Sequence, residues 1–371
     1  MRITEVTLSV LEVPGPGSQF KIVRVPGLHR IQYTHEGERT EGPRRQAFLH
    51  VRTDEGIEGL ATGGDRNTVD LLRRLVIGEE PWQREAIIQK LEGATRWIYQ
   101  RRGWFGTFDQ CLWDILGKAT GQPVCHLLGK VRDHAPVYLT GGNMDLDGYK
   151  RHIDTGREQY GIQAYKIHSY KGGRADLPLF RALRDYVGPQ YELLADPVRS
   201  YTLTEAIQVG RLMEALDYVW LEEPLHDESI TQLQELCAAL TIPVMANETL
   251  QNDMEGSCQR LLLKATDLLR ASGVYGVTQA MKMAAFAEGF GTNVEFNGQG
   301  GLFGAVSAHL LASVPNTTYY EMSRPGREAA KEFGIENVPE VEDGQFGPTD
   351  GPGFGLVVDG DYFKRLTVET Y

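Results

Sequence analysis

Three acidic residues in the second half of the chain stand at equal intervals, each at the end of a short apolar run. They are Asp196, Glu222 and Glu248, which are spaced 26 and 26 residues apart. This interval is close to one β-strand plus one α-helix, and parallel strands bring their carboxyl ends to one rim. Carboxylates that converge need a cation, and ligation by oxygen alone suits a hard divalent ion such as Mg²⁺. The spacing therefore predicts a metal site, although any one of these acids alone would be read as a solvated loop residue.

A lysine and a histidine stand two residues apart in the run Ala164-Tyr-Lys-Ile-His168. Side chains alternate along a strand, so Lys166 and His168 share one face and are expected to point into the same rim. A nearby metal ion and a second cation would lower the pKa of the lysine, and histidine already titrates near neutral pH. Either residue is therefore a candidate general base. The alternative is a surface strand with two polar residues turned outward.

Eight strand-like runs alternate with amphipathic stretches after residue 129, which predicts a (β/α) barrel. The runs cover 136–140, 164–168, 191–196, 218–222, 243–248, 268–274, 292–296 and 318–321. An open doubly wound sheet would alternate in the same way, but a GxGxxG turn should follow its first strand. The sequence Thr140-Gly-Gly-Asn143 does not fit that turn, so the barrel is favoured.

The first part of the chain has a different pattern of apolar and polar residues. Residues 1–60 contain two or three strand-like runs separated by a Gly-, Pro- and Arg-rich segment, 14–45, which we expect to be a long loop. From residue 68 to 128 the apolar residues recur at helical spacing. With 371 residues the chain exceeds the size of one hydrophobic core. We predict an α+β unit at 1–130, the barrel at 131–334, and a segment at 335–371 that returns to the first unit.

Composition narrows the possible partners. The chain is 41% hydrophobic and 24% charged, as in ordinary globular proteins, and its net charge of −12 gives no basic field for nucleic acid or an anionic membrane. No stretch approaches the roughly 20 apolar residues of a membrane helix, and the N-terminus is strand-like rather than a signal peptide. The four cysteines lack CxxC spacing, as expected of reduced thiols in a cytoplasmic protein. A small molecule is the expected partner.

Several motifs together resemble the enolase superfamily, and within it the mandelate racemase-like subgroup. They are Lys166-x-His168, Leu-Ala-Asp196, Trp220-Leu-Glu222-Glu-Pro224, Ala-Asn-Glu248, Thr53-Asp-Glu-Gly56, the run Leu112 to Pro123, Val277-Thr-Gln-Ala280 and Val314-Pro-Asn316. The resemblance implies a modified TIM barrel, (β/α)7β, closed by an α+β capping domain, and a homo-oligomer. It also implies Mg²⁺ held by the three acids, which stabilises the enediolate formed when a base removes the proton α to a carboxylate.

Departures from the family pattern bear on the reaction. Where relatives carry an Asp-His pair on the sixth and seventh strands, this chain has Arg270 and Asn297, and no lysine lies between 264 and 282 to serve instead. Racemisation by two bases is therefore disfavoured. A β-elimination remains possible if Lys166 or His168 takes the α proton and the other, or Glu295, assists the leaving hydroxyl. Glu295 shares a strand face with Asn297 and has the alternative role of pairing with a cation.

Two further features concern the substrate. Glu321 matches the eighth-strand acid that hydrogen-bonds the substrate carboxylate in relatives, and to do so it must be protonated, which nearby acids would favour. The expected loop is dense in basic and hydrogen-bonding side chains that suit carboxylates and hydroxyls; the candidate substrate contacts are Arg24, His29, Arg30, Tyr33 and Arg44. This density favours a polyhydroxylated acid, possibly a diacid, unless these residues pair with the loop's own glutamates.

The leading hypothesis is thus an Mg²⁺-dependent acid-sugar dehydratase, a hydro-lyase that gives a 2-keto-3-deoxy acid. A cycloisomerase or epimerase of a sugar acid or its lactone would use the same enediolate. A relative that binds a carboxylate without turning it over is the alternative from another class, and the retention of Lys166 and His168 beside three acids argues against it.

Overall fold

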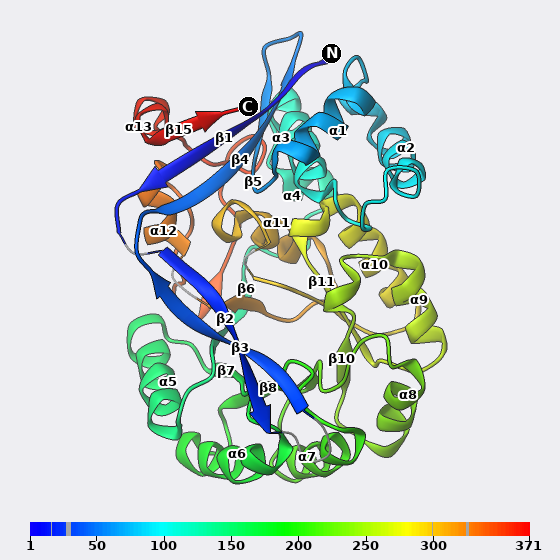
Figure 1. The fold of residues 1–371 in the computed structure, drawn as a ribbon, viewed down its shortest axis with the longest axis vertical. Helices are drawn as coiled ribbons and strands as arrows, with labels where there is room; N and C mark the ends of the chain where they lie inside the picture. Colours follow the sequence, from blue (N-terminus) through cyan, green and yellow to red (C-terminus); the bar gives the residue numbers. More distant parts are fainter. Residues whose placement is uncertain (16, 27–30, 299, 324–325) are drawn as a thin grey trace.

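Two main sheets organise the chain in the computed structural model, which describes residues 1–15, 17–26, 31–298, 300–323 and 326–371. One is an antiparallel sheet with strand order β15-β1-β4-β5, and the other is a nearly closed parallel barrel with the order β12-β11-β10-β9-β8-β7-β6-β13. In Figure 1 the antiparallel sheet stands at one end of the molecule and the barrel at the other. The predicted combination of a barrel and an α+β cap is confirmed.

The barrel strands fall where the sequence pattern placed them, although several are shorter. Their bounds are β6 (Ala135–Gly141), β7 (Ala164–His168), β8 (Glu192–Asp196), β9 (Leu221–Glu222), β10 (Val244–Ala246), β11 (Leu268–Ala271), β12 (Val294–Phe296) and β13 (Tyr320–Met322). The helices that follow them and cover the outside are α5 (Leu146–Tyr160), α6 (Gly173–Val187), α7 (Leu203–Ala215), α8 (Ile230–Ala239), α9 (Met254–Leu262), α10 (Val277–Gly289) and α11 (Ala305–Ser313).

Alternation along these strands separates two kinds of side chain. The outward set packs against the helices in the large core. The inward set forms a separate buried cluster inside the barrel, which contains Tyr138, Ala164, Leu194, Trp220, Met245 and Tyr319. Inward-facing residues two positions further along these strands therefore lie beyond this inner cluster, near the carboxyl ends of the strands.

The cap is built on β1 (Ile3–Val13), β4 (Arg44–Thr53), β5 (Glu58–Thr62) and β15 (Thr367–Thr370), with α1 (Arg66–Val76), α2 (Arg84–Thr95) and α3 (Gly106–Thr120) packed on it. Helix α3 also contacts the barrel. Asp109 accepts hydrogen bonds from the backbone nitrogen of Thr278 at 2.7 Å and from its hydroxyl at 2.6 Å. The Trp113 indole donates to the same hydroxyl at 3.0 Å, so α3 and the first turn of α10 are joined through buried polar groups.

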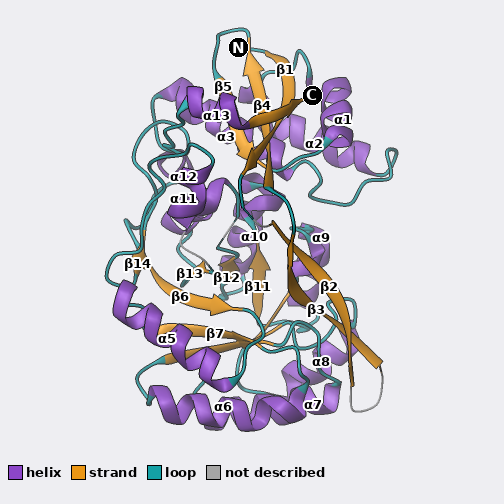
Figure 2. Cartoon of the chain, turned by 60° about the vertical axis from the view of Figure 1, so that its left-hand side comes forward, coloured by secondary structure: helices purple, strands orange, loops and turns teal. Residues whose placement is uncertain are grey.

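The segment expected to be a long loop is a β-hairpin, so that prediction was wrong. Strand β2 (Gly17–Pro26) pairs with β3 (Ile31–Thr40) over their whole length, and the pair forms its own two-stranded sheet. The run Phe20-Lys-Ile-Val-Arg-Val25 is rich in β-branched residues and Ile31-Gln-Tyr-Thr34 alternates, but the surrounding glycines, prolines and arginines led to the prediction of a loop. The hairpin extends from the cap alongside the barrel (Figures 1 and 2).

The last part of the chain runs back from the barrel to the cap. It contains α12 (Gly326–Glu332), β14 (Gln345–Phe346), which pairs with β6, and α13 (Gly360–Leu366), before β15 pairs with β1. A short helix, α4 (Val124–Leu128), connects the cap to the barrel. Among the described residues, no helix is both long and apolar enough to cross a bilayer. All four cysteines are free.

Candidate active site and metal ligands

Lys166 lies at the centre of a buried cluster of charges inside the barrel. Its ammonium Nζ is 2.8 Å from Glu222 Oε2 and 2.9 Å from Glu321 Oε1, and the side chain is only 1% exposed. Its Nζ also lies 5.3 Å from the centre of the Tyr138 ring. Strand β7 delivers Lys166 to this point because Tyr165 and Ile167, its chain neighbours, face the outer core instead.

The predicted lowering of the Lys166 pKa is not found in this arrangement. Burial and the neighbouring Arg270 guanidinium both act to lower it, but the carboxylates of Glu222 and Glu321 outweigh them and hold the pKa well above its usual value. The prediction counted the cations around the lysine and omitted its two carboxylate partners. The predicted lowering was for a lysine beside a metal ion bound to Asp196, Glu222 and Glu248, and the choice of base between Lys166 and His168 stays a prediction.

His168 shares the inner face of β7 with Lys166 and lies nearer the solvent, with 17% of its side chain exposed. Its Nε2 is 3.0 Å from Asp196 Oδ2, and its Nδ1 is 2.7 Å from the Thr140 hydroxyl. Burial acts to lower the pKa of His168, but the Asp196 carboxylate outweighs burial and raises it. Asp196 itself is held by a second contact, because the backbone nitrogen of Val198 donates to its Oδ1 at 2.9 Å.

The Arg270 guanidinium connects the acids on the other side of the cluster. Its Nε lies 3.1 Å from Glu222 Oε1 and 3.3 Å from Glu248 Oε2. One terminal nitrogen forms a short ion pair with Glu321, and the other donates to the Tyr138 hydroxyl at 3.2 Å. Arg270 is 1% exposed, and its contacts with Glu222, Glu321 and Tyr138 are buried, whereas the Glu248 side chain is 34% exposed.

Glu321 is ionised in this setting, so the expectation that it is protonated was wrong. Burial alone would raise its pKa, but Arg270 and Lys166 outweigh burial and hold the pKa well below its usual value. The sequence showed the dense acids, whereas only the structure shows that Lys166 and Arg270 both form ion pairs with Glu321.

The three predicted metal ligands lie on or just after three adjacent strands, but they are not gathered around one point. Among the residues that the structure describes, no three His, Cys, Asp or Glu side chains form a ready-made metal cluster. Instead, each of the three carboxylates has a cationic or histidine partner. Asp196 pairs with His168, Glu222 with Lys166, and Glu248 with Arg270.

The donor chemistry nevertheless fits a divalent cation. Glu223, the residue after Glu222, is 5% exposed, and its Oε1 has no hydrogen-bond partner in the described part of the chain. Burial raises the pKa of Glu223, and the carboxylates of Asp196 and Glu248 raise it further. A group of buried acids with an unpaired oxygen and too few cations is the setting that a hard metal ion satisfies. Asp196, Glu222 and Glu248 would hold it.

Sequence reasoning missed the residue that aims Glu248. Strand β10 ends at Ala246, and Asn247 then adopts a left-handed conformation with φ of 91°. The buried Asp227 carboxylate fixes this turn, because it accepts from the backbone nitrogens of Asn247 at 2.9 Å and Thr249 at 3.0 Å. The available signal was an acid three residues after the Glu-Glu-Pro motif, which by itself does not distinguish a turn-holding role from a solvated one.

Two other predicted residues lie at the seventh strand, Glu295 on β12 and Asn297 just after it. Glu295 does not join the charge cluster: its carboxylate accepts from the backbone nitrogens of Thr318 and Tyr319 at 3.0 and 3.2 Å. It therefore fastens β12 to the segment before β13, where the barrel strands are not paired. Asn297 does lie beside the cluster, with its Nδ2 3.4 Å from Glu248 Oε1.

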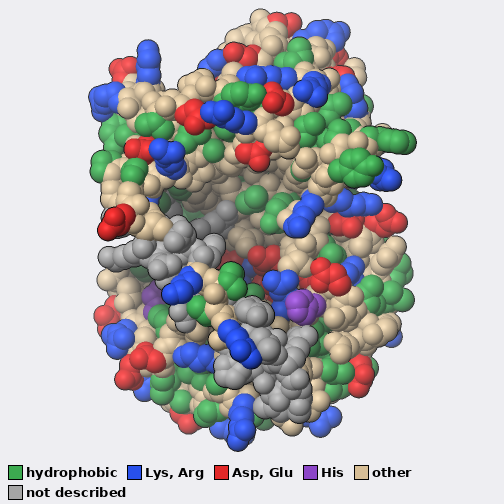
Figure 3. Space-filling model, in the orientation of Figure 1, with side chains coloured by type: hydrophobic (Ala, Val, Ile, Leu, Met, Phe, Trp, Pro, Cys, Tyr) green, Lys and Arg blue, Asp and Glu red, His purple; other side chains and the backbone are tan. Residues whose placement is uncertain are grey.

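The five predicted substrate contacts of the N-terminal segment stay a prediction, because the structure describes the side chains of only Arg24 and Arg44 among them. His29 and Arg30 lie outside the described residues. Arg24 is exposed on β2, where its backbone lies opposite Tyr33 of β3. Arg44, at the start of β4, forms an ion pair with Glu332 of α12 at 2.6 Å. Figure 3 shows the surface hollowed between the cap and the barrel, with acidic and basic side chains in the depression.

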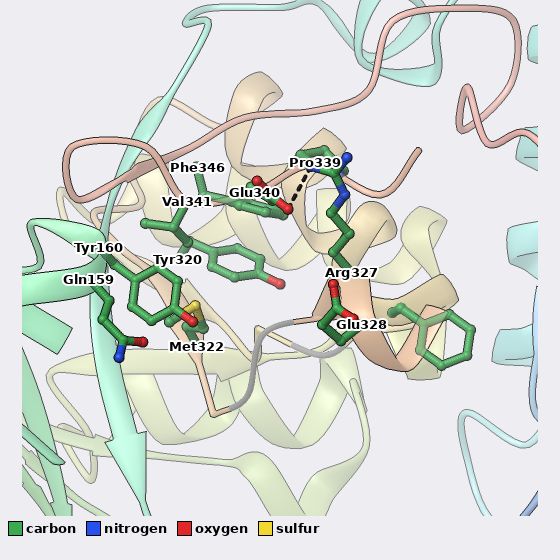
Figure 4. A pocket seen from close by; sticks show the side chains of 11 residues that line it. Gln159, Tyr160, Tyr320, Met322, Arg327, Glu328, Pro339, Glu340, Val341 and Phe346 are labelled. Carbon is green, nitrogen blue, oxygen red and sulfur yellow. Dashed lines mark ion pairs between the residues drawn. The ribbon is translucent and has the colours of Figure 1, made fainter. Parts of the chain in front are cut away.

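A cavity of about 270 Å³ lies on the outer side of β13, away from the charge cluster. Tyr320 lines it together with Tyr160, Phe346 and Met322, and the ion pair between Arg327 and Glu340, 2.6 Å long, closes one side (Figure 4). Tyr320 faces this cavity because it alternates with Glu321, which points inward. The cavity is thus separated from the charge cluster by the strand itself.

Comparison with known proteins identifies the family. Residues 148–362 match the family model described as enolase C-terminal domain-like, and residues 30–129 match that of the mandelate racemase / muconate lactonizing enzyme N-terminal domain. The chain belongs to the enolase superfamily.

Similar members are named as enzymes that act on acid sugars. A D-galactonate dehydratase family member of Streptomyces bingchenggensis is 27% identical, with 89% of this chain and 92% of that protein covered. The D-galactarolactone cycloisomerase of Agrobacterium fabrum is also 27% identical, with 90% and 94% covered. The structure of D-glucarate dehydratase from Agrobacterium tumefaciens, complexed with magnesium, superimposes with a TM-score of 0.85 at 25% identity and full coverage of both chains. These relatives, named as dehydratases and a cycloisomerase, support an enzyme within the enolase superfamily.

Proposed function

We propose that the protein is an Mg²⁺-dependent dehydratase of a mono- or diacid sugar, which removes the proton α to the carboxylate and gives a 2-keto-3-deoxy acid. The observation that carries the proposal is the pair Lys166 and His168 on one face of β7, each within 3.0 Å of a carboxylate of the predicted metal set. The names of its relatives support the choice of substrate class.

The geometry separates the roles of the two residues. His168 has the greater exposure, 17% against 1%, so it is the group that a substrate can reach, and we assign it as the base. Lys166 lies deeper, with its ammonium between Glu222 and Glu321, where it would supply positive charge to the substrate carboxylate as the proton leaves. Thr140 orients the imidazole through Nδ1, and Nε2 then faces Asp196, one of the proposed metal ligands.

The need for a cation follows from the charge on the intermediate. Removing a proton next to a carboxylate creates a second negative charge on an already anionic group, so the transition state needs more positive charge than the substrate does. Held by Asp196, Glu222 and Glu248, Mg²⁺ would supply that charge and offset the charge of Asp196, which holds the His168 proton here.

A cycloisomerase is the second candidate, because relatives of both kinds are similar to this chain to the same degree. A dehydratase must protonate a leaving hydroxyl, and Glu295 is committed to backbone groups. If His168 serves both steps, the proton that it takes from the α carbon goes to the hydroxyl that leaves. A cycloisomerase instead breaks an intramolecular C–O bond with the same half-site.

A substrate screen tests the proposal. Mono- and diacid sugars and their lactones are incubated with the protein and Mg²⁺ in deuterated water, and keto-acid formation and α-deuterium are followed in the same tubes. Keto acid from one or a few stereoisomers supports dehydration. A rearranged lactone or anhydro sugar opened without loss of water would favour the cycloisomerase, and deuterium exchange without either product would favour an epimerase. No conversion or exchange across the library would contradict an acid-sugar enzyme.

We further propose that the protein acts as a homo-oligomer in the cytoplasm on a small carboxylate, with no nucleic-acid or membrane partner. The three-part division into 1–130, 131–334 and 335–371 is proposed on the same footing. The pairing of β15 with β1 supports the return of the last segment to the cap, and the free cysteines suit a reducing compartment.

A further inference from the structure

The Arg270 side chain is positioned where two proposed metal ligands meet. Its Nε lies within 3.3 Å of carboxylate oxygens of both Glu222 and Glu248. Glu222 lies at the end of β9, and Glu248 follows the neighbouring strand β10. A divalent ion held by Glu222 and Glu248 would draw on the same two carboxylates. It would compete with the Arg270 guanidinium for their negative charge, and the two cations would repel each other.

The remaining contacts of Arg270 keep it in this place without the help of the two ligands. The Tyr138 hydroxyl and the Glu321 carboxylate bind its two terminal nitrogens, and Glu321 is not one of the proposed ligands. Tyr138 and Glu321 therefore hold the terminal nitrogens of Arg270, while its Nε contacts the carboxylates of Glu222 and Glu248.

The charges of the cluster show why such a residue is needed. Asp196, Glu222, Glu248 and Glu321 carry four negative charges, and Lys166 and Arg270 supply two positive ones. Without Arg270, Glu248 would lose the cation with which it pairs, and the buried Glu222 and Glu321 would share Lys166 alone in the metal-free protein. Removing one partner of a buried ion pair is strongly destabilising.

We propose that Arg270 is a built-in counter-cation that holds Glu222 and Glu248 in the metal-free enzyme and competes with the divalent ion for them. The inference rests on the proposed function, since it assumes that these acids are the metal ligands. Arg270 stabilises the empty site, and the same charge weakens metal binding. At a separation of about 6 Å, repulsion by a unit positive charge lowers the affinity for a divalent ion about tenfold, even at the dielectric constant of water.

Metal titration of charge variants tests this role without using activity. The chelator-treated wild type, Arg270→Gln and Arg270→Lys are titrated with Mn²⁺, and the free ion is measured by electron paramagnetic resonance. Arg270→Gln should bind Mn²⁺ at least about tenfold more tightly than wild type, and Arg270→Lys, which keeps the charge, should stay within about threefold. The metal-free Arg270→Gln protein should melt below wild type, and saturating Mn²⁺ should raise its Tm more than that of wild type.

A charge-neutral variant keeps the test valid if Arg270→Gln does not fold. Tyr138→Phe removes one anchor of the guanidinium and leaves every charge in place, so Mn²⁺ should bind a few-fold more tightly. If Arg270→Gln binds Mn²⁺ no more tightly than wild type, the proposed competition is wrong. Where Arg270→Gln does not fold, the same result for Tyr138→Phe overturns it. Absence of Mn²⁺ binding in wild type and in every variant overturns both the competition and the proposed metal site.

Discussion

His309 provides a sharp test of how burial sets stability, because it is completely buried where α11, α4 and the C-terminal segment meet. The backbone nitrogen of Cys125 donates to its Nδ1 at 3.1 Å, and its Nε2 lies 3.4 Å from the Phe354 carbonyl. The neutral imidazole satisfies both contacts, with Nε2 as the donor. A second proton would have to go to Nδ1, which would break the bond to Cys125.

The magnitude follows from the pKa. Burial lowers the pKa of His309 from 6.5 to about 4, and the nearby His126 and Lys130 act in the same direction. Because the unfolded chain binds the proton more readily, the contribution of His309 to stability is complete above pH 6.5 and is lost as the pH falls toward 4. Integration between these values gives about 3 kcal/mol lost at pH 4.

The assay compares wild type with His309→Asn, in which the amide oxygen can accept from Cys125 and no proton is taken up. Urea unfolding in chelator is followed by tryptophan fluorescence from pH 7.5 to 4, and the difference in unfolding free energy between the two proteins is plotted against pH. Contributions from carboxylates are shared and cancel. The wild type should lose about 3 kcal/mol relative to the variant. A difference that does not change with pH, or an imidazole that titrates near 6.5 by NMR, would refute the reasoning.

Three further predictions concern the site and the packing that supports it. His168→Asn should lower kcat by at least about 100-fold and leave Mn²⁺ affinity within a few-fold, measured beside the exposed-helix control His126→Asn; substantial turnover in His168→Asn would exclude it as the base. Asp109→Ala should destabilise the protein by about 2 kcal/mol, because the backbone nitrogen and hydroxyl of Thr278 lose their acceptor at the junction of cap and barrel, and an unchanged Tm would contradict this. Gly298→Ala should fail to fold or lose activity, because an added Cβ would collide with the Glu321 carbonyl oxygen, and a fully active, stable Gly298→Ala would show that the close approach is not required. The control is Gly93→Ala at an exposed position of α2, where the added Cβ meets nothing within 4 Å and should raise the Tm.

The sequence determined the fold and the cluster's principal residues. The acids at equal spacing and the alternating Lys-x-His run each depend on a short-range period, which one strand or one βα unit sets locally. For that reason the run Ala164–His168 matches β7 residue for residue. The pairing of β2 with β3 was missed because the glycines, prolines and arginines of this segment indicated a loop, and the run 20–25 is β-branched without a regular alternation.

Only the tertiary structure decided how the charges pair. Strand alternation would put Glu248 on the outer face with Ala246, and it is the left-handed turn at Asn247, held by Asp227 from another loop, that brings it beside Arg270. The protonation of Lys166 and Glu321 likewise depends on which opposite charge lies within about 3 Å, since Coulomb energy in a buried site changes steeply with distance. Residue types and spacing along the chain set which strand face a side chain occupies, whereas the partner across the barrel is fixed only when the strands close around a common centre.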